Sequence, residues 1–431
     1  MGTDGAMHSS LPKKCSLFLR AALILAMATL PVRAGTTETV IHTFEGGTDG
    51  DEPSSPLVGD RHGNLFGVTI VGGAVRCNQG RGCGTVFEIS ASGVETILHA
   101  FDGRRDGEFA VGTLVVGNSD RLYGEVETGN LECHLTSGSC GKVYEISPSD
   151  REIVLHTFKT DDHGAFPYGG LIEDAAGNLY GTTEYGGDFN CQPTYGCGTV
   201  FRVAPDKTTV VLHAFAGGED GVYPVSQLFL AKTGNFYGNT ESGGGTGCGG
   251  YGCGTIFKLV SDGTETILHA FRGGDDGEVP SGPLTMDKRG SLYGTTEDGG
   301  SAKGGTVFKI SPDGRERVLY SFKGGSDGYV PGSGVIIDRS GNLYGTTAWG
   351  GGNGTGCFYN TGCGTVFELA ADGTESILYN FQGGPDGDTP DGLFVDKSGN
   401  VYGTTAYGGD ANCEGGMGCG VVYELGLKIT Q

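Results

Sequence analysis

The sequence has no hydrophobic run long enough to cross a membrane, and it has little positive charge. Its main apolar run covers residues 21–30, whereas a membrane-spanning helix needs about 20 residues. Acidic residues outnumber basic ones by 51 to 28, which gives a formal net charge of −23. Such a surface repels nucleic acid and anionic lipid. We therefore expect no nucleic-acid partner and no membrane span in the mature chain.

Helical periodicity is absent beyond residue 35, and so are several enzyme motifs. The chain has no His-Glu-x-x-His zinc motif, no phosphate-binding loop and no nucleophile elbow. Residues 245–250 match G-x-G-x-x-G, but they lie in a cysteine-containing loop with no helix after it. We therefore predict no catalytic residue, no resident metal and no cofactor, and an enzyme is the less favoured reading.

Residues 1–34 have the pattern of a secretory signal peptide. Basic residues at positions 13, 14 and 20 flank the apolar run, and a small-residue cleavage site ends at Ala34. The alternative is an uncleaved anchor. Cleavage leaves 24 basic and 50 acidic residues, a formal charge of −26, in a mature domain of residues 35–431. We expect a secreted, periplasmic or cell-envelope protein.

Glycine is the most over-represented residue, with 85 copies, and these copies recur at fixed positions of a long repeat. In the sixth copy, residues 341–347 read GNLYGTT, and residues 364–369 read GTVFEL after a Gly-rich loop. Residues 383–387 then read GGPDG. A period of about 50 to 60 residues indicates stacked supersecondary units.

Each repeat contains four strand-like runs, which we call a, b, c and d in chain order. In the sixth repeat they are residues 334–338, 342–347, 365–369 and 376–381. Rows of four-stranded antiparallel units are typical of a β-propeller. Strand c occurs seven times, so the prediction is an all-β, seven-bladed propeller.

The first strand of the chain has no repeat of its own. Residues 39–44 read as a d strand that precedes any a strand, and the last repeat stops after its c strand. We expect residues 39–44 to complete the last blade, which closes the ring and leaves no sheet edge bare.

Strand order also sorts the loops onto two faces. The d–a and b–c connections lie on one face, here called the loop face, and the a–b and c–d turns lie on the other, the turn face. The turns are short and nearly identical among repeats, whereas the b–c loops vary and carry cysteines. Variable loops on a rigid scaffold are typical of a recognition surface.

Twelve of the thirteen cysteines form six local pairs, each in the b–c loop of a different repeat. An even number in an exported chain predicts disulfides, each worth about 2 kcal/mol by the chain-entropy argument. Zinc is the alternative, but two sulfurs per loop without a recurring histidine make a poor zinc site. The predicted pairs are Cys77–Cys83, Cys133–Cys140, Cys191–Cys197, Cys248–Cys253, Cys357–Cys363 and Cys413–Cys419.

These residues resemble the GloVer tandem repeat, a bacterial repeat with the pattern GNLYGTT…GG…GTVFKI…LHSF…GG.DG. The resemblance covers essentially the whole mature chain. It implies an exported, propeller-like protein, and it implies no reaction.

Two more residue sets recur. Histidines, replaced twice by tyrosine, occupy one position of strand d, and we expect each to pack between blades and hydrogen-bond a neighbouring turn. An aspartate recurs in the d–a loop, where an Asp-Gly turn is the simpler reading and calcium the alternative, because calcium needs six to eight oxygens. The first set is His42, His99, His156, His213, His269, Tyr320 and Tyr379; the aspartates are Asp49, Asp106, Asp220, Asp276, Asp327 and Asp386.

An acidic arc beside aromatic residues is the candidate binding site. A glutamate follows strand b in four consecutive repeats, and an aromatic residue follows the same position in three repeats. Carboxylates accept hydroxyl or ammonium donors, and aromatic faces stack on sugar rings. The simpler alternative is a solvated rim with packed aromatics. The residues are Glu127, Glu184, Glu241 and Glu297, with Tyr185, Trp349 and Tyr407.

We also expect Tyr168, Gln227, Ser333 and Asp391 to border a wet channel mouth, because they enter strand a. The function predicted from all of this is a monomeric, exported binding or scaffold protein whose loop face holds a glycan or an extracellular protein. One alternative is a propeller glycan hydrolase or lyase that uses two carboxylates of the arc. Another is a structural cell-envelope protein without a small ligand.

Overall fold

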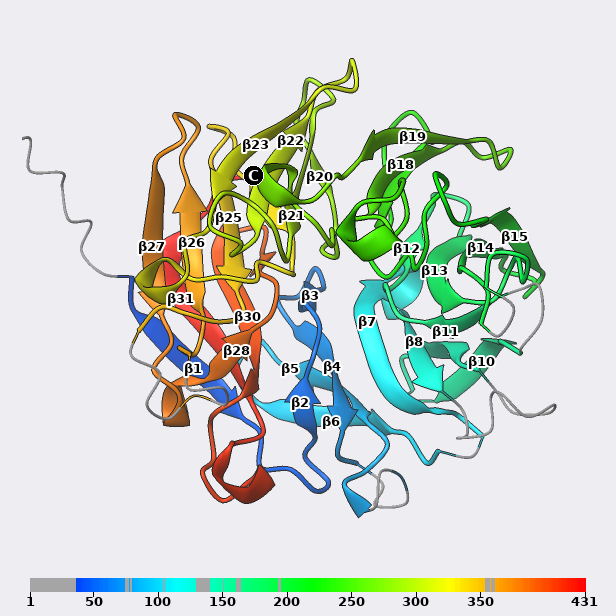
Figure 1. The fold of residues 1–431 in the computed structure, drawn as a ribbon. Helices are drawn as coiled ribbons and strands as arrows, with labels where there is room; N and C mark the ends of the chain where they lie inside the picture. The colour runs from blue at the N-terminus through cyan, green and yellow to red at the C-terminus, as the bar shows by residue number, and fades with distance from the viewer. Residues whose placement is uncertain are drawn as a thin grey trace, which may run out of the picture. The chain divides into compact units, whose positions relative to one another are not determined.

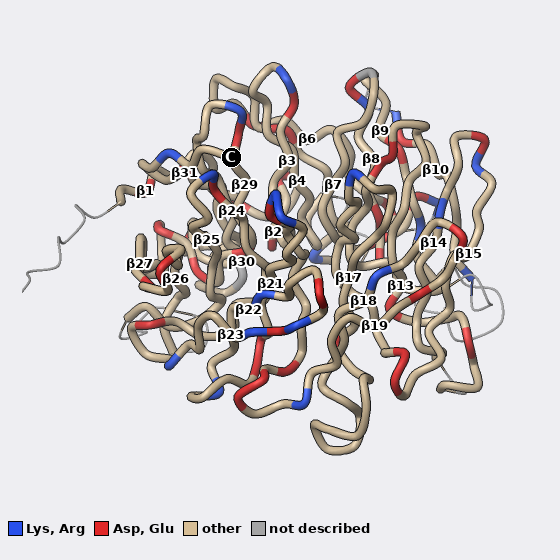
Figure 2. Tube along the Cα trace, turned by 90° about the horizontal axis from the view of Figure 1, so that it is seen from above, with Lys and Arg blue, Asp and Glu red and all other residues tan. Residues whose placement is uncertain are grey.

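Seven antiparallel sheets form the blades of a propeller in the computed structural model (Figure 1). The structure describes residues 36–73, 77, 80–103, 105–128, 140–149, 151–159, 164–192, 195–352, 357 and 361–431. The predicted signal peptide and Cys133 lie outside these residues. Within them, no helix is long and apolar enough to cross a membrane. Acidic positions are spread over the whole chain (Figure 2).

The blades follow one another along the chain. Blade 1 holds β2 (Asp51–Pro53), β3 (Val58–Gly59), β4 (Leu65–Val71), β5 (Thr85–Ile89) and β6 (Glu95–Ala100). Blade 2 holds β7 (Glu108–Val116), β8 (Leu122–Thr128), β9 (Lys142–Ile146) and β10 (Glu152–Thr157). Blade 3 holds β11 (Ala165–Pro167), β12 (Ile172–Glu173), β13 (Leu179–Tyr185), β14 (Thr199–Val203) and β15 (Thr209–Ala214). Blade 4 holds β16 (Phe229–Leu230), β17 (Phe236–Thr240), β18 (Thr255–Leu259) and β19 (Glu265–Ala270).

The last three blades have the same order. Blade 5 holds β20 (Thr285–Met286), β21 (Leu292–Thr296), β22 (Thr306–Ile310) and β23 (Glu316–Ser321). Blade 6 holds β24 (Val335–Ile337), β25 (Leu343–Thr347), β26 (Thr365–Leu369) and β27 (Glu375–Asn380). Blade 7 holds β28 (Asp388–Pro390), β29 (Phe394–Val395), β30 (Asn400–Tyr407), β31 (Val421–Lys428) and β1 (Glu38–Thr43). The short 3₁₀ turns are η2 (Asn118–Asp120), η3 (Cys248–Gly250), η4 (Gly274–Asp276), η5 (Gly325–Asp327), η6 (Gly384–Asp386) and η7 (Glu414–Gly416).

Ring closure by the first strand is confirmed. β1 pairs antiparallel with β31, with Glu38 opposite Leu425 and Thr43 opposite Val421. The pairing shifts register by one residue between Val40 and His42, and the c–d strand pairs of the other blades carry the same bulge. The closing strand therefore reproduces the geometry that the other blades build from consecutive strands.

The core lies between neighbouring blades, and glycines on the b strands make room for it. Phe367 of blade 6 is fully buried and packs with Val307 and Phe322 of blade 5. A Cβ atom on Gly345 would lie 2.7 Å from the Cζ atom of Phe367. Only glycine leaves space for this ring, which explains the invariant glycine of the LYGTT segments within this chain.

A recurrent backbone hydrogen bond links each blade to the next. The residue just before the inner strand's proline or alanine adopts a positive φ of 56–63°, a conformation that is strained for β-branched residues such as Val330. Its N–H donates to a carbonyl of the preceding blade's b–c loop at 2.7–3.2 Å. The donors, here called link residues, are Glu52, Phe109, Phe166, Tyr223, Val279, Val330 and Thr389.

The acceptor of this link is the second cysteine of the b–c loop in six blades. Thr389, for example, donates to the carbonyl of Cys363 at 3.0 Å. In blade 5, which has no cysteine there, Gly304 supplies the carbonyl to Val330. The cysteine loops therefore hold the joints between blades.

The disulfide prediction is confirmed for five loops. The bonds join Cys77–Cys83, Cys191–Cys197, Cys248–Cys253, Cys357–Cys363 and Cys413–Cys419. Cys140 is also disulfide-bonded.

Candidate functional site

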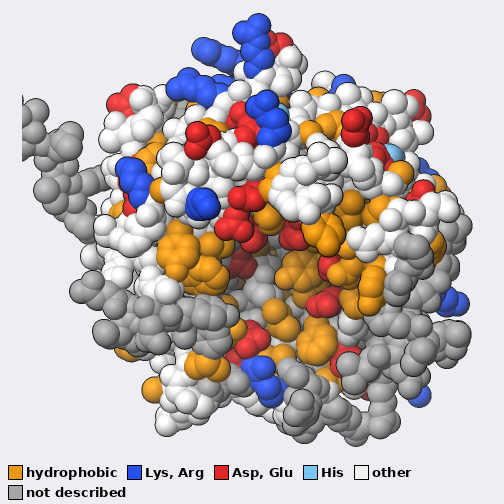
Figure 3. Space-filling model, viewed as in Figure 1, with side chains coloured by type: hydrophobic (Ala, Val, Ile, Leu, Met, Phe, Trp, Pro, Cys, Tyr) orange, Lys and Arg blue, Asp and Glu red, His pale blue; other side chains and the backbone are white. Residues whose placement is uncertain are grey.

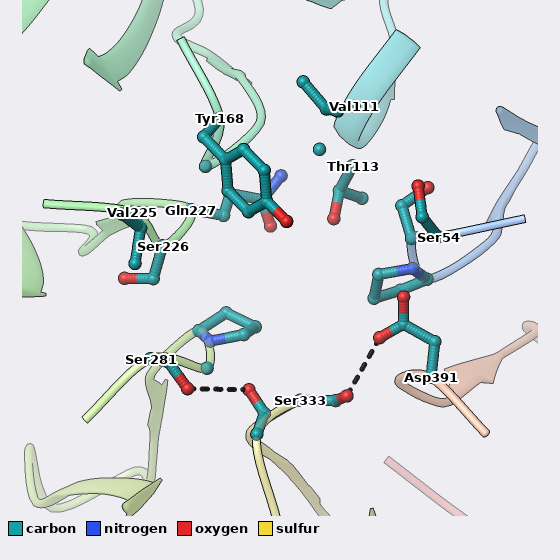
Figure 4. A pocket seen from close by; sticks show the side chains of 17 residues that line it. Ser54, Val111, Thr113, Tyr168, Val225, Ser226, Gln227, Ser281, Ser333 and Asp391 are labelled. Carbon is teal, nitrogen blue, oxygen red and sulfur yellow. Dashed lines mark hydrogen bonds between the residues drawn. The ribbon is translucent and has the colours of Figure 1, made fainter. Parts of the chain in front are cut away.

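The inner segments of all seven blades meet at the central axis and enclose a cavity of about 90 Å³ (Figure 4). Tyr168, Gln227, Ser333 and Asp391 line it, as the sequence predicts. The space suits a few water molecules and is too small for a sugar ring. The lining segments are residues 54–56, 111–113, 168–169, 225–227, 281–283, 332–333 and 391.

Asp391 supplies the one carboxylate among these lining residues. Its Oδ1 atom accepts hydrogen bonds from the Ser333 hydroxyl at 2.9 Å and from the Gly392 N–H at 2.7 Å. Burial raises the pKa of Asp391 above its usual range. Figure 4 shows the phenol of Tyr168 pointing into the opening from the other side. A carboxyl group and a phenol therefore face one polar opening.

The four glutamates of the predicted arc interact with one another and with this opening. Burial and then the carboxylates of Glu297 and Glu184 raise the pKa of Glu241 to about 7. Burial and the neighbouring Glu184 also raise the pKa of Glu127. The arc is thus a continuous acidic surface across blades 2 to 5, because each carboxylate is close enough to its neighbour to disfavour ionisation.

The arc reaches the channel itself. The Ser281 hydroxyl, which lines the cavity, donates to Glu297 Oε1 at 2.6 Å. Burial, and then the carboxylates of Glu127, Asp391, Glu184 and Glu241, raise the pKa of Tyr168 to about 12. Tyr168 is nevertheless 44% exposed, so its ring stands in an open mouth. Acidic and hydrophobic side chains gather around a hollow near the middle of the face seen in Figure 3.

The link residues position the arc. The N–H of Glu241 donates to the carbonyl of Tyr223 at 3.0 Å, and that of Glu297 donates to Val279 at 3.0 Å. Blade 6 repeats the bond with Ala348 and Val330. The backbone hydrogen bond to the link residue therefore directs the side chain just after strand b toward the axis. That side chain is charged where the residue is glutamate and uncharged where it is alanine.

The three aromatic residues predicted beside the arc lie on different blades. Tyr185 packs with Phe166, Tyr195 and Tyr223 at ring-centroid distances of 5.3–5.4 Å, in a cluster between blades 3 and 4. Trp349 packs edge to face on Tyr329 at 5.4 Å. Tyr407 lies opposite Asp388 in the β28–β30 pair. All three are half-buried, and their use in binding stays a prediction.

The sequence predicts Tyr168 and Asp391 at the channel mouth, but it does not include them among the ligand-binding residues. Their signal was available, because each follows its link residue by the same two positions. A second omission is the pair of exposed b–c loop tyrosines, Tyr195 and Tyr251, which are 42% and 78% exposed. Both stand two residues before the second cysteine of their loop, so their shared position was visible in the sequence.

The recurrent histidines and aspartates form pairs on the outer strands. His99 Nε2 lies 3.0 Å from Asp106 Oδ2, and the Tyr320 hydroxyl donates to Asp327 at 2.6 Å. Each histidine ring also packs edge to face on the phenylalanine two residues later. The packing recurs in all five histidine copies, whereas a hydrogen bond to the aspartate is seen for His99 and His213.

A glutamate of the next blade joins most of these pairs. His42, Asp49 and Glu95 offer ligand atoms within 4.8 Å of one another, and so do His269, Asp276 and Glu316. These two clusters are where a metal ion could be held. Where tyrosine replaces histidine, the two carboxyl groups remain. The copy with His156 differs, because Thr209 stands in place of the glutamate and its hydroxyl lies 2.8 Å from His156 Nδ1. Calcium at these aspartates stays a prediction.

Thermal stability is expected to fall by several degrees as the pH rises from about 4.5 to 8. Burial and then Asp220 raise the pKa of Glu265 to about 7, with His213 opposing, and Glu375 is raised similarly by burial and Asp327. A raised carboxyl pKa means that the fold prefers the protonated form. The stabilisation from the protonated carboxyl is complete below its pKa in the unfolded chain, near 4.5, and is lost as the pH rises through 7. Melting temperature against pH measures this.

The control for this experiment is a neutral mimic of the protonated acid. Glu265→Gln should reduce the pH dependence by the share of one carboxyl, whereas Glu219→Gln, on an exposed d–a loop, should leave it unchanged. A native profile that is level between pH 5 and 8 would contradict the prediction.

Comparison with known proteins gives a family and a fold. The family model described as the Gloeobacter/Verrucomicrobia repeat matches residues 29–191 and 133–359. No curated protein matches the chain.

Among solved structures, virginiamycin B lyase from Staphylococcus aureus aligns with a TM-score of 0.55 and 14% identity, over 91% of this chain and 99% of that one. The extracellular domain of the putative one component system BT4673 from B. thetaiotaomicron aligns with a TM-score of 0.55 and 11% identity, over 91% of this chain and 40% of that one. At these identities the likeness concerns the fold alone.

Proposed function

Because the chain belongs to the Gloeobacter/Verrucomicrobia repeat family and gathers carboxylates around one end of its channel, we propose that it is an exported binding protein. Its loop face holds a glycan or a protein partner at the channel mouth. The groups that contact the ligand are the arc glutamates, Tyr168 and Asp391.

The observation that carries this proposal is the convergence of five carboxyl groups and one phenol on a single opening. Carboxylates this close repel one another, so a ligand that brings ammonium or hydroxyl donors lowers the free energy of the site. The ring of Tyr168 offers an aromatic face to a sugar ring or a cation. Since the cavity measures about 90 Å³, the ligand sits on the mouth and inserts only a small polar group.

A glycan array and a trilysine peptide separate the two partner classes, and isothermal titration then measures affinity. The double variant Glu184→Gln/Glu241→Gln is expected to weaken binding at least tenfold, because it removes two charges from the middle of the arc. Glu219→Gln, on the same face but outside the arc, should bind as the native protein does. Equal affinity of the double variant and the native protein would show that the arc glutamates do not bind the ligand.

A second candidate is a glycan hydrolase or lyase that uses the same carboxylates. It is favoured by Glu241, since a carboxyl with a pKa of about 7 can act as a general acid or base at neutral pH. Assaying turnover of the ligand found on the array distinguishes the two. An enzyme loses turnover in Glu241→Gln while binding remains, and a binding protein has no turnover to lose. If Trp349→Ala and the arc variant both leave every interaction unchanged, a structural envelope role is favoured instead.

A further inference from the structure

A second and larger cavity, of about 780 Å³, lies between blades 5 and 6. It is bounded by the a–b turns 287–289 and 338–341 and the c–d turn 370–373, so it opens on the turn face, away from the acidic arc. Its volume is within the range of pockets that enclose small organic ligands, about 300–1,000 Å³. The larger apolar side chains of its lining are Met286, Leu319, Ile336, Ile337, Leu343 and Leu369.

The groove is rich in basic residues, whereas the protein as a whole is acidic. Five cationic side chains line it, although the chain has 51 acidic and only 28 basic residues. Figure 2 shows Lys and Arg positions around β22 and β23. The five residues are Lys288, Arg289, Lys309, Arg317 and Arg339.

Three aspartates also line the groove, and each accepts hydrogen bonds from its own turn. Asp338 Oδ1 accepts the N–H groups of Ser340 and Asn342, each at 2.8 Å. Asp287 accepts the N–H of Arg289 at 2.8 Å and the Tyr293 hydroxyl at 3.0 Å. The third, Asp372, caps its own turn through the Thr374 N–H. These carboxylates serve the turn backbone that recurs in other blades, and Asp287 Oδ2 also lies 3.8 Å from Lys309 Nζ.

The cations are less engaged. Lys309 donates to the Tyr293 hydroxyl at 2.7 Å, and Arg339 Nε donates to the carbonyl of Gln431 at 2.6 Å. Lys288, Arg289 and Arg317 are exposed and form no ion pair with any residue that the structure describes. The groove therefore has positive charge available at its edge and apolar surface at its floor.

Arg289 and Arg317 do not belong to the repeat pattern. The position of Arg317 in strand d holds Thr39, Thr96, Ile153, Val210, Thr266 and Ser376 in the other blades. The position of Arg289 in the a–b turn holds His62, Ala176, Thr233, Ser340 and Ser398. A residue needed to form the blade would recur, so the blade fold does not require either arginine.

We propose that the groove between blades 5 and 6 binds an anionic amphiphile, a small molecule with a carboxylate, sulfate or phosphate group on an apolar body. The apolar body packs against Leu319, Ile336 and Leu369. The guanidinium groups of Arg289 and Arg317 contact the anionic group, for which their planar donors are well suited. This site is separate from the channel mouth and does not depend on the function proposed for it.

Isothermal titration of the mature protein with 2-naphthalenesulfonate tests the proposal. Sulfate supplies the charge alone and 2-naphthol supplies the rings alone. We expect one saturable site for the sulfonate and binding at least tenfold weaker for the other two probes. The double variant Arg289→Gln/Arg317→Gln should lose at least tenfold in affinity for the sulfonate. Both arginines are exposed, so melting temperature should confirm an intact fold.

Two controls make the result specific. Lys397→Gln changes an exposed cation in the equivalent a–b turn of blade 7 and should leave sulfonate binding unchanged. Glu241→Gln at the channel mouth should also leave it unchanged. No saturable sulfonate binding by the native protein, or equal affinity in the arginine variant and the Lys397 control, would overturn the proposal.

Discussion

Deletion of residues 36–44 is expected to abolish cooperative folding of the propeller. The deletion removes β1 and with it the pairing to β31, which leaves the edge of blade 7 bare. It also removes Phe44, which is fully buried and lies 5.1 Å, ring centroid to ring centroid, from Phe87 of blade 1. Loss of a buried phenylalanine alone costs about 3–5 kcal/mol. Thermal unfolding followed by circular dichroism should show no single transition in the deletion.

Point variants make this prediction falsifiable if the deletion fails to express. Phe44→Ala should lower the free energy of unfolding by about 3–5 kcal/mol. Its neighbour Glu45 is exposed, and Glu45→Ala should be neutral. A synthetic peptide of residues 36–45 should restore the transition of the truncated chain. A truncated chain that unfolds as the native protein does would show that closure by β1 is dispensable.

Reduction of the disulfides is expected to have the second large effect, a fall of roughly 10 kcal/mol in the free energy of unfolding for the five bonds described. The chain-entropy argument gives about 2 kcal/mol for each loop, and the five contributions are taken as additive because each lies in a different blade. The loss also loosens the carbonyls that accept the links between blades. Guanidinium denaturation with and without reductant measures the change.

Blade 5 supplies the internal control for this prediction. Its b–c loop has no cysteine, yet Gly304 still accepts the link from Val330. The link from blade 5 should therefore be unaffected by reductant. Because the total loss is comparable with the stability of a typical domain, the reduced protein should unfold at a much lower midpoint. The paired variant Cys357→Ser/Cys363→Ser should cost about 2 kcal/mol. An unchanged midpoint under reducing conditions would contradict the prediction.

Repetition explains how much of the fold could be predicted from the sequence. Glycines such as Gly345 recur because a ring fills the space beside them, so the b strands were visible as a pattern. The unpaired first strand could be placed by counting, and the cysteine pairs by their shared loop. Each of these features depends on one residue type at one position.

The features that were not predicted depend on backbone conformation or on neighbours in another blade. The link residues include Glu52, Val279 and Thr389, and no side-chain type marks their left-handed conformation. Asp220 and Glu265 come from neighbouring blades, so their proximity depends on how the two blades pack together. The spacing of residues along the sequence does not give this packing. The groove cations were not predicted because a comparison of repeats finds only residues that recur. An arginine stands at the position of Arg317 in one repeat alone.

Closure by the first strand also determines when, during synthesis, the ring of blades can close. β31 follows β1 in the chain only after blades 1 to 6, so β1 has no partner until all of these blades have been synthesised. Once β31 has been made, the edge of blade 7 accepts the β1 of a second chain as readily as its own, since both present the same hydrogen-bonding groups. Strand-exchanged dimers are therefore the expected by-product at high expression, and dilution during refolding favours the monomer.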